Sequence, residues 1–377
     1  MSRVEVWNAV LLGKEEKLMR KLMVGKIWIP AFLLAVAMAG CGDSDKQGSA
    51  TSPLTAPTVL SVVPGLAATG VCQGAVVTAT FSKAMNPATI NATTFTLAAG
   101  TTAVLGTVSI DSTDTVATFT PMNPLVVNTQ YTATITTGAQ DQFGSGLAQA
   151  FVWMFTTATT ACPAPIAIAP ELCGTGILAG SAVTNAAGAS VVNGDVDISP
   201  GSAIAGFPPG IINGTRHTTD AIAAAAQSRL TTAYTTASTL PPGTLLVGDI
   251  GGKNLPPGVY TRTTASGAGG PSLGITGNLT LDPVGDPNAT WIFQIESTLT
   301  TAGGSVTVLP PGKPGNVFWA IGSAATLGIN TTMAGNLMAQ AAITANGGNT
   351  LNGRALARTA GAVTISTTTI NVPPCGP

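Results

Sequence analysis

Side chains that commonly carry out acid–base or nucleophilic chemistry are scarce in this sequence. His217 is the one histidine in 377 residues, and no nearby serine or cysteine lies in a nucleophile motif. Asp195 and Asp197 are two residues apart, so on a strand they would share a face and could bind calcium or act as paired acids. Asp282 and Asp286 flank a turn, where aspartate usually serves the turn itself. We therefore expect no enzyme activity, no metal site and no cofactor.

Threonines recur instead, at the spacing of strands with one exposed face. Within residues 291–372, an apolar run, a short alternating run and a turn follow one another four times. Side chains alternate between the two faces of a strand, so the apolar members of each alternating run would point inward. These inward residues are Leu299, Leu327, Ile343 and Val363, at intervals of 28, 16 and 20 residues. Such repetition predicts a solenoid of stacked β-coils.

The outward face of this solenoid would be flat and almost free of charge, since only four of the 82 residues are charged. Stacked strands lie about 4.8 Å apart, and same-face residues along a strand about 6.7 Å apart. Threonine holds its methyl and hydroxyl groups in few rotamers, so a grid of threonines could order water at low entropic cost. The predicted contact residues are Thr298, Thr300, Thr326, Thr344, Thr364 and Ser366. An alternative face comprises Thr307, Thr331, Thr332, Thr350, Thr368 and Thr369. The residue pattern alone favours the simpler interpretation that these threonines reflect strand propensity on a solvated surface.

The composition is that of an all-β protein with many turns. Charged residues make up 8%, the mean hydropathy is +0.40, and the formal net charge is −1. The hydropathy argues against disorder, and the charge balance excludes the basic surface that nucleic acid requires. The length suffices for two domains and a leader.

The first 41 residues have the pattern of an export signal. The apolar run at 27–40 follows the basic residues Lys14, Lys17, Arg20, Lys21 and Lys26, and it ends in small residues before Cys41. Residues 37–41, Ala-Met-Ala-Gly-Cys, resemble a bacterial lipobox, which implies acylation of Cys41 and attachment to a membrane; Met38 stands where leucine is usual. A plain secretory signal is the alternative, and Met19 or Met23 could be the true start. Residues 42–57 are predicted to form a polar linker.

Export makes the remaining cysteines candidates for disulfides. Cys72, Cys162, Cys173 and Cys375 allow three pairings. Cys72 and Cys162 bracket one predicted domain, and Cys173 and Cys375 bracket the next, so we favour these two pairs.

Residues 58–160 are predicted to form a β-sandwich. Alternating runs at 76–81, 116–120, 131–135 and 151–155 are separated by turn clusters, a spacing typical of such domains. The phrases at 81–90, 119–121 and 131–135 resemble the bacterial Ig-like domain of surface-layer and adhesin proteins. This resemblance implies a spacer or adhesion module.

Residues 161–377 are predicted to hold the solenoid and one helix over about 219–238. Thr218 or Thr219 could cap this alanine-rich helix, with Asp220 in its first turn. Apolar residues at three- to four-residue spacing would form its packing stripe, including Ile222, Ala226 and Leu230.

Several phrases of this region resemble the microbial ice-binding protein family. They lie at residues 194–201, 206–210, 213–215, 255–260, 279–282, 285–289 and 352–358. The resemblance implies a mainly β fold: a right-handed, three-faced β-helix with one long α-helix alongside and coils that do not stack in strict chain order. It also implies a monomer whose partner is the surface of ice. The family often has a cysteine at the position where this chain has Gly315. This departure implies a disulfide that differs from the family's, in agreement with a Cys173–Cys375 bond.

Three functions follow as hypotheses. The first is an extracellular or lipid-anchored protein that binds ice through a flat threonine-rich face. The second is a cell-surface adhesin or structural protein that binds protein or glycan. The third, a β-helix enzyme acting on polysaccharides, is disfavoured because the repeat has few charged residues.

Overall fold

The computed structural model describes residues 55–374, apart from 165, 167–169, 268–269, 311 and 359. The predicted leader with Cys41, most of the linker, and Cys375 lie outside the described residues.

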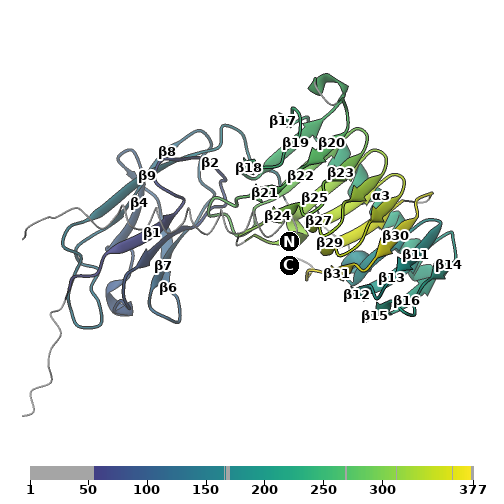
Figure 1. Cartoon of the computed structure of the whole chain (residues 1–377). Coiled ribbons are helices and arrows are strands. Elements are labelled where there is room, and N and C mark those ends of the chain that lie inside the picture. The colour runs from purple at the N-terminus through teal and green to yellow at the C-terminus, as the bar shows by residue number, and fades with distance from the viewer. Residues whose placement is uncertain are drawn as a thin grey trace, which may run out of the picture. The chain divides into compact units, whose positions relative to one another are not determined.

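The first described domain is a sandwich of two sheets, which confirms the predicted Ig-like fold (Figure 1). One sheet has the antiparallel order β1(Val59–Val63), β3(Val77–Phe81), β7(Val116–Pro121), β6(Gly106–Ile110). The other has the order β2(Ala68–Val71), β9(Phe151–Thr157), β8(Gln130–Ile135), β4(Phe95–Ala99), β5(Thr102–Ala103). Alternate residues of these strands fill the space between the sheets, where Phe95 packs against Phe119 and Trp153. Cys72 and Cys162 form the predicted disulfide.

The second domain is a solenoid of parallel strands with three faces, as predicted. We name its faces by what they carry. The threonine face is the sheet β14(Ala203–Ala205), β11(Ala182–Ala187), β30(Val363–Ser366), β28(Ile343–Ala345), β26(Ala325–Leu327), β23(Leu299–Thr301), β20(Leu273–Ile275). The asparagine face comprises β15(Ile211–Ile212), β12(Val191–Asn193), β31(Thr369–Asn371), the first halves of β29(Thr350–Ala357) and β27(Thr332–Ala339), β24(Val306–Val308), β21(Asn278–Leu281) and β18(Asn254–Leu255).

The helix face completes the solenoid. It comprises β16(Arg216–Thr218), β13(Asp195–Ile198), β10(Thr175–Ala179), the second halves of β29 and β27, β25(Val317–Ile321), β22(Trp291–Ile295), β19(Gly258–Arg262) and β17(Thr244–Leu245). The strands β27 and β29 turn the corner between two faces at Gly335 and Gly353, both of which have positive φ. A Cβ on Gly353 would lie 1.9 Å from the carbonyl oxygen of Gly335, so the corner requires glycine.

The coils do not stack in chain order. The strands β10, β11 and β12 of the first coil pair in parallel with β29, β30 and β31 of the last. In Figure 1 the teal coils therefore lie beyond the yellow last coil, while the coils that follow the helix lead away in the other direction. This stacking agrees with what the family resemblance implies.

The helix α3(Ala221–Thr239) explains why the strands of the helix face read as continuous apolar runs. Residues such as Ile292, Phe318 and Met338 point outward and are covered by α3, while their neighbours fill the interior. Inside, Phe293 and Trp319 stack with ring centroids 3.9 Å apart. Both sides of these strands are thus buried.

Two details of the predicted helix are wrong. The N-cap is Asp220, whose carboxylate accepts a 2.9 Å hydrogen bond from the Ala223 amide, rather than Thr218 or Thr219. The packing stripe runs through seven residues: Ala223, Ala226, Gln227, Leu230, Ala233, Tyr234 and Ala237. Ile222 is 50% exposed. An aspartate directly before an alanine run caps better than a threonine one residue earlier, and alanines let the helix approach the sheet closely.

The buried guanidinium of Arg354 forms hydrogen bonds at the junction between the first and the last coil, where the stacking departs from chain order. It donates to the carbonyls of Leu172, Cys173 and Pro373 at 3.1, 2.8 and 3.0 Å, and to Oδ1 of Asn336 at 3.0 Å. Burial lowers the pKa of Arg354 to about 10, so the side chain stays charged at neutral pH. It joins the short helix α2(Pro170–Cys173), the last coil and the C-terminal segment.

We expect Arg354→Met to lower the free energy of unfolding by about 3–5 kcal/mol, because it removes the donors and leaves buried acceptors without partners. Urea unfolding of the full chain measures this loss. Lys253→Met is the control at an exposed position, where we expect a change within about 0.5 kcal/mol. A loss below about 1 kcal/mol for Arg354→Met would show that these bonds contribute little.

Candidate functional site

Five threonines line up across the threonine face. Thr300 pairs with Thr326, Thr326 with Thr344 and Thr344 with Thr364, each as a direct neighbour on the adjacent strand. Thr364 pairs in turn with Thr184 of β11. All five are exposed or half-buried, while the residues on either side of them point into the core. We call this line the threonine row.

The row lies between two flanking lines of small residues. On one side are Ser272, Thr298, Ala324, Ala342 and Ala362, and on the other Thr276, Ala302, Gly328, Asn346 and Ser366. Of the predicted contact residues, Thr300, Thr326, Thr344 and Thr364 are therefore in one row, and Thr298 and Ser366 flank it. None of the outward positions of these seven strands carries a charge.

Thr184 is the member of the row that the sequence analysis missed. The segment Ala182-Val183-Thr184 has the same alternation as the other strands, and Val183 is fully buried. This local signal marks a strand, but only the pairing of β11 with β30 places Thr184 beside Thr364.

The structure aligns three of the six threonines of the alternative face and buries the other three. Thr332, Thr350 and Thr369 are direct neighbours on the asparagine face and are half-buried. Thr307 instead points inward, is 7% exposed, and its hydroxyl lies 3.3 Å from Sδ of Met333. Thr331 and Thr368 are each 1% exposed. Thr307 and Thr368 therefore cannot contact a flat surface, because their side chains are enclosed by neighbouring coils.

A ladder of asparagine side chains runs beside these threonines. Asn213 donates to Asn193 at 2.7 Å, Asn193 to Asn371 at 2.9 Å, and Asn371 to Asn352 at 3.0 Å. The ladder crosses the junction between the first and last coils. Its amides bond to one another along the stack, so they hold coils together and offer fewer groups to a partner.

The structure brings Asp197, His217 and Asp220 close together, and His217 pairs directly with Asp197 on the neighbouring strand. Asp195 and Asp197 lie on β13 as predicted, but Asp197 is 1% exposed and accepts a 2.6 Å bond from Oγ1 of Thr175. Its Oδ1 has no hydrogen-bond partner among the described residues. Nδ1 of His217 lies 2.8 Å from Oδ2 of Asp220, and this contact raises the pKa of His217. In the described part of the chain, no group of three or more histidine, cysteine or acidic residues could hold a metal ion.

Comparison with known proteins finds matches to both domains. A family model described as Ice-binding-like matches residues 177–371, and a model described as Bacterial Ig-like domain matches residues 54–157. An ice-binding protein of Nostoc sp. (strain HG1) is 47% identical over 198 residues, which cover 52% of this chain and 70% of that protein. An ice-binding protein of Flavobacterium frigoris (strain PS1) is 32% identical over 201 residues, covering 49% and 68%. A solved structure of an ice-binding protein from an Antarctic biological consortium superposes with a TM-score of 0.53 at 40% identity, covering 57% of this chain and 94% of that one.

The buried carboxyl of Asp197 makes the stability of the solenoid depend on pH. Burial raises the pKa of Asp197 from 3.8 to about 6, although the bond from Thr175 and the charge of His217 oppose the rise. Between these values the folded chain binds more protons at Asp197 than the unfolded chain does. The stability that this carboxyl contributes is therefore fully present below pH 3.8 and is lost as pH rises to about 6. The raised pKa of His217 contributes stability that is present below pH 6.5 and is lost as pH rises further.

We expect Asp197→Asn to remove this slope and to stabilise the chain at pH 7 by up to about 3 kcal/mol, since the neutral amide carries no charge to bury. Urea unfolding at pH 4, 5, 6 and 7 measures it. Asp282→Asn is the control and should keep the wild-type slope. A wild-type slope in Asp197→Asn would mean that Asp197 does not titrate in this window.

Proposed function

The chain belongs to the ice-binding-like family, and we propose that it binds ice through the threonine face. The observation that carries this proposal is the row of five threonines held in register on an uncharged parallel sheet. Neighbouring strands place the side chains about 4.8 Å apart, which makes a rigid lattice of methyl and hydroxyl groups. Ordered water can bridge hydroxyls across such a lattice, and methyl groups hold that water in place without competing for it.

The absence of charged side chains on the threonine face is as important for ice binding as its hydroxyl groups. An ionised side chain keeps its own hydration shell, and removing that shell costs free energy. Threonine also loses little side-chain freedom when it contacts a solid, unlike lysine or glutamate. Each contact is weak, so the face acts through the number of positions that meet ice at once.

The threonine face suits this role better than the asparagine face. The aligned threonines on the asparagine face number three, and the row continues into Val191 on one side and Val306 on the other. The adjacent asparagines bond mainly to one another. The helix α3 covers the outward residues of β10, β22, β25, β27 and β29 on the helix face, so these residues do not meet solvent.

We further propose that the chain acts outside the cell and without catalysis. The predicted leader directs export, and acylation of Cys41 would anchor the chain to a membrane. The Ig-like domain would then serve as a spacer between the anchor and the ice-binding domain. No helix among the described residues is long and apolar enough to span a membrane. A role as a cell-surface adhesin for protein or glycan is the alternative, and it predicts no effect on ice growth.

We expect Thr344→Tyr to abolish most thermal hysteresis, because a ring at the centre of the threonine row would hold ice away from its neighbours on both sides. The melting temperature should stay close to that of the wild type, since the side chain points to solvent. Nanolitre osmometry and circular dichroism measure the two quantities.

Thr350→Tyr on the asparagine face is the matched control, because it lies on a strand of the same solenoid with similar exposure. It should keep full thermal hysteresis. Full activity in Thr344→Tyr together with a loss in Thr350→Tyr would move the site to the asparagine face.

A further inference from the structure

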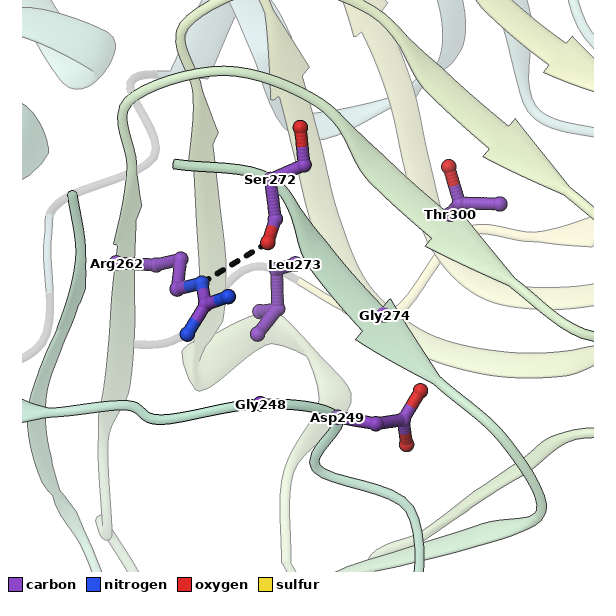
Figure 2. A pocket seen from close by; sticks show the side chains of 7 residues that line it. All are labelled: Gly248, Asp249, Arg262, Ser272, Leu273, Gly274 and Thr300. Atoms are coloured by element: carbon purple, nitrogen blue, oxygen red, sulfur yellow. Dashed lines mark hydrogen bonds between the residues drawn. The ribbon is translucent and has the colours of Figure 1, made fainter. Parts of the chain in front are cut away.

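At the β20 end of the sheet, the threonine row stops one strand before the edge. The next strand after β23 is β20, and the residue that pairs with Thr300 there is Gly274. The carboxylate of Asp249 occupies the space that a sixth side chain would need. A Cβ on Gly274 would lie 2.6 Å from Oδ2 of Asp249, and Figure 2 shows this carboxylate beside Gly274.

Asp249 is fixed in this position by hydrogen bonds. Its Oδ1 accepts from the amides of Gly251 and Thr276 at 2.7 and 2.9 Å, and its Oδ2 accepts from the hydroxyl of Thr276 at 3.0 Å. The amide of Ile250 donates to the carbonyl of Gly274 at 3.0 Å. The segment around Asp249 therefore covers the edge strand of the threonine face, and it places a side chain carboxylate there.

The surface beside Thr300 is also hollow. A cavity of about 440 Å³ is lined by Gly248, Asp249, Arg262, Ser272, Leu273, Gly274 and Thr300 (Figure 2). Arg262 is 1% exposed, and its guanidinium donates to the carbonyls of Ser272 and Leu246 at 2.9 and 2.8 Å. The regular plane of small groups thus gives way to a depression with a negative charge at its rim.

We propose that Asp249 sets the end of the ice-contacting area at Thr300, an inference that rests on the proposed function of the threonine face. An exposed carboxylate binds water tightly, and ice could advance over β20 only by stripping that water away. The same carboxylate protects the edge strand from pairing with another chain, since charged groups at sheet edges prevent such pairing. Protection of the edge therefore limits the area that meets ice.

Two variants test this. Asp249→Asn removes the charge and keeps an Oδ1 acceptor for the two amides. The double variant Asp249→Gly with Gly274→Thr adds a sixth threonine to the row. Its new side chain has room, because the three atoms nearest to a Cβ on Gly274 all belong to the side chain of Asp249. The backbone of Gly274 is not in the left-handed region, so threonine is compatible with it.

We expect both variants to raise thermal hysteresis at equal protein concentration, the double variant by at least about 1.2-fold, the ratio of six positions to five, if adhesion grows with contact area. Circular dichroism at the assay temperature, near the freezing point, verifies that each variant is folded. Asp111→Asn is the control, because the carboxylate of Asp111 also accepts two backbone amide bonds but lies in the Ig-like domain. It should leave activity unchanged.

Unchanged or reduced hysteresis in a folded Asp249→Asn would overturn the inference. If Asp249→Asn does not fold, the double variant decides, and a folded double variant that is no more active than the wild type has the same consequence. Thr344→Tyr separates the two proposals. Loss of activity in that variant, with no gain in the Asp249 variants, leaves the proposed function intact and removes the role of Asp249.

Discussion

Parallel pairing between successive coils is the interaction on which the threonine face depends. From β23 to β30, the pairs follow one another residue by residue without a shift of register. A slip of one residue would turn Leu299 or Ile343 to solvent and bury the threonines, so the apolar interior and the exposed row enforce the same register. The spacing of the row is therefore set by the backbone and does not depend on contacts among the threonines.

Burial on the opposite side keeps this surface stiff. The helix α3 covers the outer side of the helix face, and Phe293 stacks on Trp319 inside. Arg354 and the asparagine ladder fasten the first coil to the last, which adds Thr184 to the row. A rigid plane meets ice without losing much conformational freedom, so stability and function rely on the same packing.

The alternation of residues within each strand could be predicted from the sequence, because it depends only on which side chains must be buried. The alternation predicts one exposed face for Thr300, Thr326, Thr344 and Thr364. It does not predict that Thr184 joins them, because local patterns do not encode which coils are neighbours when the stack departs from chain order. Thr307 is predicted to lie on the alternative exposed face, but its strand aligns Thr307 with buried Leu279. The spacing of Asp195 and Asp197 indicates a pair of acids on one face of a strand. The burial of Asp197 could not be predicted from the sequence, because it depends on how the strands and the helix pack.

We propose that this chain adheres to ice as a folded, uncharged plane. The most direct measurement is the uptake of the purified full chain into a slowly grown polycrystalline ice hemisphere, with the protein concentrations in ice and in the remaining liquid compared. We expect the protein to be enriched in the ice. A chain that is excluded into the liquid like an ordinary solute, while still folded, would contradict this proposal.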